Sequence, residues 1–217
     1  LQIMYAFCRY VDDIVDAPKH TSISSEVDNQ NKISALQNIQ SEITSSHSKT
    51  AVTEEIIRLI QTGNIKKSVV DHFILGQAWD LSHSIILSET ELFQYCYGVA
   101  STVGLLICNV FGITNKNAIR HAADLGIAMQ LTNIARDVHE DAVNNRVYLP
   151  QSWFEKPLTP TDILHDESRK EEIFQAIQKL LRLADTYYQS TDKGMVYLPS
   201  RARSAMLVAA KVYKKIG

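Results

Sequence analysis

Two clusters of acidic residues with the same spacing stand far apart in this sequence. The first contains Asp12, Asp13 and Asp16, and the second contains Asp137 and Asp141. Apolar residues recur at helical spacing around both clusters, so acids four positions apart share one face of a helix. Like charges at that spacing destabilise a helix by a few tenths of a kcal/mol per pair. Two such clusters in otherwise apolar segments favour an external cation, and they predict a magnesium–diphosphate site.

The first cluster belongs to a stripe of chemically useful side chains. Tyr5, Arg9, Asp12 and Asp16 are spaced four, three and four residues apart, so they share one helix face. Asp13 lies on the flank of this stripe, where it can pair with Arg9 at i,i+4. Taken alone, the stripe fits a solvated acidic patch at a helix end equally well.

The second cluster continues a row of oxygen-bearing side chains at spacings of three and four. The row consists of Gln130, Asn133, Asp137, Glu140 and Asp141. Arg136 stands beside it and can pair with Glu140 at i,i+4. An exposed helix face again explains the row by itself, and only the conjunction of two rows argues against that explanation.

Magnesium suits such a pair of rows. It takes oxygen ligands, keeps several waters, and is usually held by one or two carboxylates together with substrate phosphates. Arg9, Arg136 and Arg146 would neutralise the remaining phosphate charge, because a guanidinium contacts phosphate oxygens two at a time.

The chemistry that needs this arrangement is the departure of diphosphate from an allylic carbon. A metal acting as Lewis acid on the leaving oxygens lowers that barrier by several kcal/mol. The carbocation left behind requires an apolar, aromatic wall that excludes water. Tyr5, Tyr95 and Tyr97 can supply such a wall, although aromatic residues at helical spacing fit an ordinary core equally well. Three small residues that follow would leave room for a long apolar ligand: Ala100, Ser101 and Gly104.

Composition limits the other possibilities. The chain has 217 residues, of which 45% are hydrophobic, which suits one well-buried domain. A net charge of −2 without any basic run gives no indication of a nucleic-acid partner. Cys8, Cys96 and Cys108 are widely spaced and form no CxxC pair, so we expect buried free thiols and a cytoplasmic location.

The pattern predicts an almost entirely helical chain. Glycine (8) and proline (5) are scarce, and no segment shows sustained alternation of apolar and polar residues. Pro18 should end the first helix, and Pro199 should begin the last one. The expected helices cover about 1–17, 31–46, 51–62, 66–87, 89–112, 115–143, 168–190 and 200–216, with an irregular stretch bracketed by Pro157 and Pro160.

One segment approaches the length of a membrane span. Residues 92–115 contain no charged side chain, but they include Gln94, Asn109 and three glycines, and basic anchors are missing at both ends. We therefore favour the central helix of a globular bundle. An oily substrate leaves peripheral membrane contact open, although no anchor is readable.

The motifs resemble those of the squalene/phytoene synthase family. Residues 5–16 match its first aspartate-rich motif, and residues 130–141 followed by 146–150 match its second. Residues 95–100 resemble the pocket-wall segment between the motifs, and 198–203 resemble a later helix. The resemblance covers essentially the whole chain.

The resemblance implies an all-α isoprenoid-synthase fold, a helical bundle around a central cavity. It implies a single domain over 1–217, with flanking N- and C-terminal helices missing from this sequence. It also implies a Mg²⁺-dependent enzyme that joins two farnesyl or geranylgeranyl diphosphates head to head through a cyclopropyl diphosphate.

Roles then carry over by position. The metal-binding residues would be Asp12, Asp16, Asn133, Asp137 and Asp141. The substrate-binding residues would be Arg9, Gln130, Asn133, Arg136, Tyr95, Ala100 and Arg146. Tyr5 would join the four aspartates in the catalytic site.

Several positions depart from the family pattern near the pocket. This chain has His139 where members commonly have Gly, Ala135 where many have Leu, and Ser101 where Gly is usual. A farnesyl diphosphate phosphatase therefore stays open, since water reaching the cation would yield farnesol. A non-catalytic module that binds prenyl diphosphates is a further alternative. Asn133, Asp137 and Asp141 do not fit the Asn/Asp–Ser/Thr–Glu triad of terpene cyclases, and no GxGxxG turn indicates NADPH.

Overall fold

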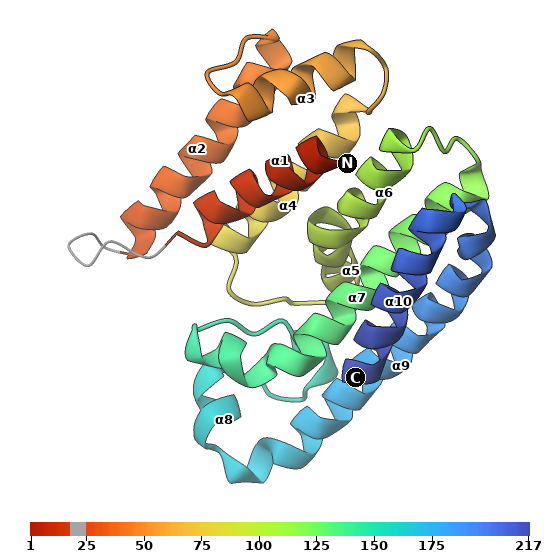
Figure 1. Cartoon of the computed structure of the whole chain (residues 1–217). Helices are drawn as coiled ribbons and strands as arrows, with labels where there is room; N and C mark the ends of the chain where they lie inside the picture. The colour runs from red at the N-terminus through yellow and green to blue at the C-terminus, as the bar shows by residue number, and fades with distance from the viewer. Residues whose placement is uncertain (18–24) are drawn as a thin grey trace.

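A computed structural model describes residues 1–17 and 25–217, and helices make up nearly all of their regular structure (Figure 1). The first half contains α1 (Gln2–Val15), α2 (Ser25–Ser45), α3 (Ala51–Gln61), α4 (Lys67–Ser82), α5 (Glu89–Cys96), the π-helix η1 (Tyr97–Ser101) and α6 (Thr102–Val110). The second half contains α7 (Lys116–Val143), η2 (Gln151–Trp153), α8 (Pro160–His165), η3 (Glu167–Arg169), α9 (Lys170–Gly194), η4 (Met195–Tyr197) and α10 (Ser200–Ile216). No strand occurs among the described residues, so the all-α prediction is confirmed.

Three predicted helix boundaries were wrong, and one helix was not expected. Helix α1 ends at Val15, two residues early, and Pro18 lies outside the described residues. Helix α2 begins at Ser25 rather than near 31, because Glu26 and Asp28 in its first turn favour the positive end of the helix dipole. The stretch between Pro157 and Pro160 is irregular as expected, but α8, which follows it, was not expected; this helix begins with a capping box between Thr159 and Asp162.

The C-terminal end of α4 is the boundary that matters for the candidate site. The helix expected over 66–87 ends at Ser82, because the following residues pair with a segment beyond α7. The Val147 N–H donates to the Ser84 carbonyl at 2.7 Å, and the Ile86 N–H donates to the Val147 carbonyl at 3.1 Å. This short parallel bridge fixes the end of α4 beside the end of α7.

Helices α5, η1 and α6 form one continuous helical stretch through the middle of the molecule. By length and composition Glu89–Val110 could cross a membrane. In the structure it packs against α4 on one side and α7 on the other, as expected for a central helix. Leu92 and Cys96 belong to a core shared with α7 and α9, whereas Leu105 and Leu106 belong to a core shared with α1–α4.

Small residues on this stretch allow close packing against α7. A Cβ on Gly104 would lie 2.6 Å from the Ala122 carbonyl oxygen, and a Cβ on Gly126 would lie 2.5 Å from the Ser101 Cα. The backbone of α7 therefore occupies the space beside Ser101, contrary to the expectation for that residue, whereas Gly104 also lines a small apolar cavity of about 40 Å³.

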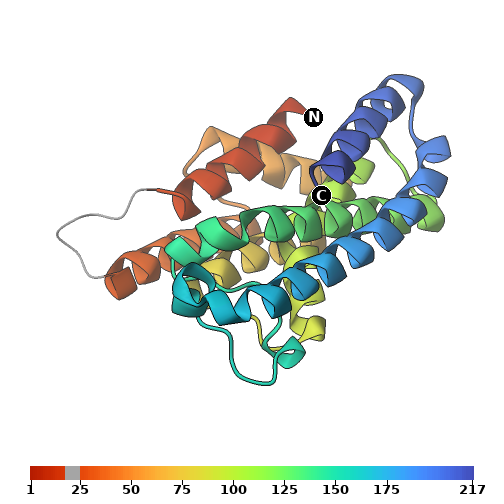
Figure 2. The same cartoon turned by 90° about the horizontal axis from the view of Figure 1, so that it is seen from below.

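Both acid-bearing helices end on the same side of the molecule. Helices α1 and α7 run in a similar direction, and their C-terminal ends lie on the left in Figure 1 and again in Figure 2, after a quarter turn. Asp12 and Asp16 belong to the end of α1, and Asp137 and Asp141 to the end of α7.

Candidate functional site

The acids of α1 form a half-exposed row at the end of the helix. Arg9 Nη2 and Asp13 Oδ1 lie 2.9 Å apart, with more than half of each side chain exposed, which confirms the predicted i,i+4 pairing. Burial raises the pKa of Asp12 to about 6, and the charge of Asp16 adds to this rise while Arg9 opposes it. Asp12 thus lies where a carboxylate is disfavoured unless a cation joins it.

A lysine from α2 holds this end of α1. Lys32 Nζ donates to the carbonyl oxygens of Val15, at 3.0 Å, and Ala17, at 2.6 Å. The same ammonium lies 3.4 Å from Asp28 Oδ2, and both side chains are nearly buried (11% and 6% exposed). A cation at these carbonyls offsets the negative end of the helix dipole.

An apolar groove of about 420 Å³ runs between α1 and α6. Its lining consists of Leu1, Gln2, Met4, Tyr5, Cys8, Val103, Leu106 and Ile107. Tyr5 is 73% exposed and stands at its edge. Leu1, Tyr5, Cys8 and Asp12 are spaced four, three and four apart, so the face of α1 that lines the groove continues to the acids. Cys8 is close enough to Asp12 to be affected by its charge. Burial and then the Asp12 charge raise the pKa of the Cys8 thiol to about 12.

The row on α7 is more buried. The amide oxygen of Asn133 is buried and has no hydrogen-bond partner among the described residues. Gln130, Asp137 and Asp141 are half-buried on the same helix. A buried acceptor without a partner lowers the stability of the fold by about 1–3 kcal/mol unless a ligand, a metal ion or water binds it.

Arg136 pairs with its neighbour rather than with Glu140. Its Nε and Nη2 atoms each lie 2.6 Å from one carboxylate oxygen of Asp137. The possible pairing with Glu140 is therefore not adopted, because a two-pronged contact to one carboxylate is stronger than a single contact.

The end of α7 gathers several charges around Asp141. Burial raises the pKa of Asp141, the charges of Asp137, Asp80 and Glu140 add to the rise, Arg146 opposes it, and together they bring the pKa to about 7. The charged form of this carboxyl is therefore disfavoured, and a cation beside it would favour that form.

Asp80, on the last turn of α4, is a carboxylate that the motif analysis missed. Its Oδ2 accepts a hydrogen bond from Arg146 Nη1 at 3.1 Å, and its Oδ1 accepts a short hydrogen bond from the Tyr148 hydroxyl. A signal was present in the sequence, since Asp80 is the only charged residue between Asp71 and Glu89.

Aromatic rings form a stack beside Asp80. The rings of Tyr148 and Tyr95 lie 5.0 Å apart and nearly parallel, and the Trp79 ring lies 5.0 Å from Tyr95 at a tilt of 42°. Tyr95 is 8% exposed, so its ring packs inside the protein, whereas Tyr5 faces the groove. Ala100, in η1, is half-buried and lines neither this stack nor the groove.

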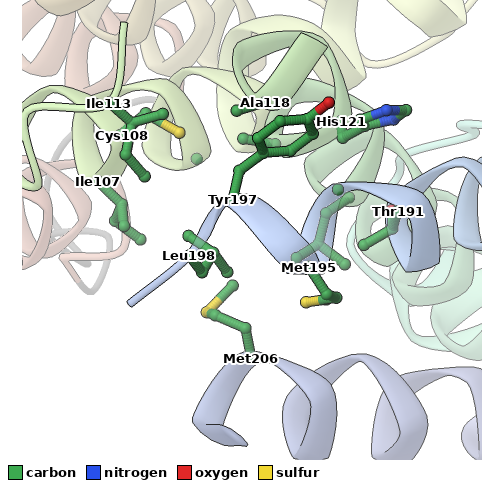
Figure 3. A pocket seen from close by; sticks show the side chains of 14 residues that line it. Ile107, Cys108, Ile113, Ala118, His121, Thr191, Met195, Tyr197, Leu198 and Met206 are labelled. Atoms are coloured by element: carbon green, nitrogen blue, oxygen red, sulfur yellow. The ribbon is translucent and has the colours of Figure 1, made fainter. Parts of the chain in front are cut away.

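A second, much smaller apolar cavity lies on the other side of α6 (Figure 3). It measures about 40 Å³ and is enclosed by α6, α7 and the segment that joins α9 to α10. Figure 3 shows the Tyr197 ring between Ala118 and His121, with Met206 of α10 opposite. Ile107 lines both this cavity and the larger groove, so α6 separates the two spaces.

The acidic rows do not form a metal cage by themselves. In residues 1–17 and 25–217, no three His, Cys, Asp or Glu side chains gather closely enough to hold an ion, and no hydrogen bond or ion pair joins the two rows. A donor set of this kind fits magnesium, which shares its coordination between a few carboxylates, waters and substrate phosphates. The orphaned Asn133 oxygen and the raised pKa values of Asp12 and Asp141 fit the same ion.

Comparison with known sequences gives a match along the whole chain. The sequence model described as squalene/phytoene synthase matches residues 1–217. A phytoene synthase from Pseudescherichia vulneris is 30% identical over 221 residues, which span 99% of this chain and 71% of the relative. A 15-cis-phytoene synthase from Enterobacter agglomerans is 30% identical over 226 residues, which span 99% of this chain and 74% of that protein.

Solved structures resemble the fold at lower sequence identity. A squalene synthase from Alicyclobacillus acidocaldarius superposes with a TM-score of 0.82 at 20% identity, covering 99% of this chain and 79% of that one. A ligand-bound dehydrosqualene synthase superposes with a TM-score of 0.77 at 24% identity, covering 98% and 72%. These two likenesses establish the helical fold.

Proposed function

Because the chain belongs to the squalene/phytoene synthase family, a family of transferases in isoprenoid biosynthesis, we propose that it joins two prenyl diphosphates head to head in a magnesium-dependent reaction. The observation that carries this proposal is the face of α1 that lines the apolar groove and then continues to Asp12 and Asp16. A prenyl diphosphate has the same order of parts, a long apolar chain followed by a charged head.

We further propose geranylgeranyl diphosphate as the substrate and phytoene as the product. The two relatives at 30% identity are both phytoene synthases, whereas the squalene-type neighbours share only 20–24% of residues. The groove follows α1 from Leu1 to Cys8, a rise of about 10 Å along the helix, and Asp12 lies one helical turn beyond Cys8. An apolar chain lying in the groove would thus point its charged end towards Asp12.

The proposed metal ligands are the two acidic rows. Asp12 and Asp16 would bind from α1, and Asn133, Asp137 and Asp141 from α7, with substrate phosphates and water completing the coordination. When bound, magnesium supplies Lewis acidity at the leaving oxygens and neutralises the charge that develops on them. The raised pKa of Asp141 supports this assignment, because desolvation and its acidic neighbours leave a cation as the natural partner.

Three arginines would hold the diphosphate. Arg9 and Arg136 each pair with an aspartate on their own helix, so both must turn from that partner to reach a substrate. Arg146 already has one nitrogen engaged by Asp80 and about a third of its side chain exposed. Their planar guanidiniums favour two-pronged contact with phosphate oxygens.

The protein must also keep water from the carbocation. Head-to-head joining of two C20 units releases two diphosphates and two protons, so a hydrocarbon forms without a reductant. The apolar lining between α1 and α6 would exclude the water that otherwise captures the cation as a prenol. The comparisons lend no support to the phosphatase alternative.

A product assay tests the proposal. The protein is incubated with Mg²⁺ and labelled geranylgeranyl diphosphate, and in parallel with farnesyl diphosphate, and the extracted lipids are separated by chromatography. We expect a C40 hydrocarbon from the C20 substrate. A C30 hydrocarbon from farnesyl diphosphate alone would show that the assigned chain length is wrong. A prenol would indicate hydrolysis, and unreacted but bound substrate would indicate a binding module.

A further inference from the structure

Asp80 stands at the meeting point of three segments, outside both acidic motifs. It belongs to the last turn of α4, and only 13% of its side chain is exposed. Both carboxylate oxygens accept hydrogen bonds from residues that follow α7, one from Arg146 and one from Tyr148. A carboxylate this buried needs such partners, because its charge is otherwise left without solvation.

The backbone that carries Arg146 is fixed independently of its side chain. Asn145 ends α7 in the left-handed conformation (φ 60°), and the Arg146 N–H donates to the Asp141 carbonyl at 2.8 Å. On the other side, Val147 pairs with the segment after α4. The remaining freedom therefore lies in the guanidinium itself.

Asp80 removes most of that freedom. It binds the Nη1 atom of Arg146, while Nε and Nη2 have no hydrogen-bond partner among the described residues. Arg146 lines one narrow pocket together with Asp141 and Tyr148, and its charge opposes the rise in the pKa of Asp141, so the guanidinium lies near the acidic row of α7. A guanidinium held by one nitrogen can still present its other edge to a two-pronged anion.

We infer that Asp80 is a positioning residue that holds the Arg146 guanidinium in place for the diphosphate group. This inference rests on the proposed function, since it assigns a diphosphate to the space beside Arg146 and Asp141. A donor oriented before binding loses less conformational freedom when the anion arrives, and it requires no rearrangement during the reaction. Asp80 acts through Arg146 and has no contact of its own with the substrate.

Asp80 accepts two hydrogen bonds, one from Arg146 and one from Tyr148, so the test must separate their effects. In Asp80→Asn the amide oxygen still accepts from the Tyr148 hydroxyl, but the charge opposite Arg146 is lost. In Tyr148→Phe the hydroxyl is lost while the Asp80–Arg146 pair remains and the ring can keep its stack on Tyr95. Asp71→Asn is the matched control, because Asp71 lies on the same helix and, among the described residues, forms its ion pair with Lys67.

The readout is the binding of inorganic diphosphate with Mg²⁺, measured by isothermal titration calorimetry, with the melting temperature recorded for each variant. We expect Asp80→Asn to bind about tenfold more weakly, as for the loss of a hydrogen bond between charged groups. Tyr148→Phe and Asp71→Asn should stay within about twofold of wild type. Added to Arg146→Gln, the Asp80→Asn change should weaken binding no further, because residues that act through one contact are not additive.

Two results would overturn the inference. One is wild-type affinity in Asp80→Asn, and the other is the same loss whether or not Arg146 is present. Should Asp80→Asn fail to fold, Asp80→Glu keeps the charge but displaces it by one methylene, and unchanged affinity in that variant would refute the role. A wild-type protein that binds Mg²⁺-diphosphate but makes no hydrocarbon refutes the proposed reaction, and the variants still decide the role of Asp80.

Discussion

The two acidic helix ends share a sequence pattern but are supported in different ways. At the end of α7, the support comes from side chains, since Arg146, which follows the helix, donates a hydrogen bond to Asp80 of α4. On α1, the backbone is held instead, because Lys32 of α2 binds the last carbonyl groups and not the carboxylates of Asp12 and Asp16. The α7 end is more buried and includes an amide oxygen without a partner.

In the candidate site, the α7 end is therefore ordered before a ligand binds, whereas the α1 end can rearrange when a ligand binds. The α7 end has its charges placed before any ligand arrives, at the cost of a carboxyl whose pKa rises to about 7. The α1 end offers half-exposed acids whose position depends on one buried ammonium. We therefore expect ligands to change the α1 end more than the α7 end.

The largest expected effect comes from removing one aspartate from either row. Asp12→Ala and Asp137→Ala should each lower kcat by at least about 100-fold, because charge on the leaving group loses its main stabilisation. The far-ultraviolet circular dichroism should stay helical. Turnover is measured by release of diphosphate from a labelled prenyl diphosphate.

Asp13→Ala is the matched control for the α1 row. Asp13 is adjacent in sequence, lies on the flank of the stripe, and makes only an exposed pair with Arg9. Its removal should change kcat by less than about threefold, as for other surface ion pairs. Normal rates in Asp12→Ala, or an equal loss in Asp13→Ala, would show that the row is not the site.

Much of the fold was predictable from pattern alone. Helical spacing and scarce glycine gave the helices, and the uncharged stretch 92–115 contains a helix that packs between α4 and α7, as expected for a central helix. The end of α4 was not predictable, because residues 83–87 leave the helix to pair with Val147, some sixty residues away. No local signal specifies such a long-range pairing. Ser101 was misassigned for the same reason, since only the structure shows α7 filling the space beside it.

The arrangement of the candidate site residues was predictable where they share one helix. Both acidic rows and the Arg9–Asp13 pair follow from spacing on one helix, whereas the 73% exposure of Tyr5 does not. Asp80 and Lys32 were missed, because each acts on a partner in another helix. Asp80 stood out only as a lone charge in an apolar stretch, and Lys32 gave no signal at all.

The second-largest effect tests the support of α1. Lys32→Met leaves Asp28 buried without its partner, so the free energy of unfolding should fall by about 3 kcal/mol. The same change frees the end of α1, so the Mg²⁺ concentration for half-maximal turnover should rise severalfold. Lys32→Arg should recover part of both losses. Denaturant melts and metal titrations measure the two effects.

Lys67→Met provides the control for that change. Lys67 pairs with Asp71 on the surface of α4, so its loss should cost less than about 1 kcal/mol and leave the metal dependence unchanged. If Lys32→Met lowers stability but keeps the wild-type metal dependence, Lys32 stabilises the fold without positioning the acids.

A smaller effect should appear in the dependence of stability on pH. The folded protein raises the pKa of Asp12 to about 6 and of Asp141 to about 7, whereas both are near 3.8 in an unfolded chain. The folded state therefore binds more protons between about pH 4 and 7, and the free energy of unfolding falls as pH rises through this range. The metal-free melting temperature should decline accordingly by a few degrees. Mg²⁺ with inorganic diphosphate should raise it more at pH 7.5 than at pH 5, and equal increases at both pH values would contradict the charge assignment.

The smallest effects should distinguish the two tyrosines of the site. Tyr5 is exposed at the edge of the groove, whereas Tyr95 is buried beside Trp79 and Tyr148. Tyr5→Ala should raise KM about fivefold at an unchanged melting temperature, because it removes apolar contact with the substrate and no core packing. Tyr95→Phe keeps the ring stack and should leave KM unchanged, with only a small loss of stability. Steady-state kinetics and thermal melts measure both variants. A rise in KM for Tyr95→Phe with none for Tyr5→Ala would move the prenyl chain from the α1 groove to the aromatic stack beside α7.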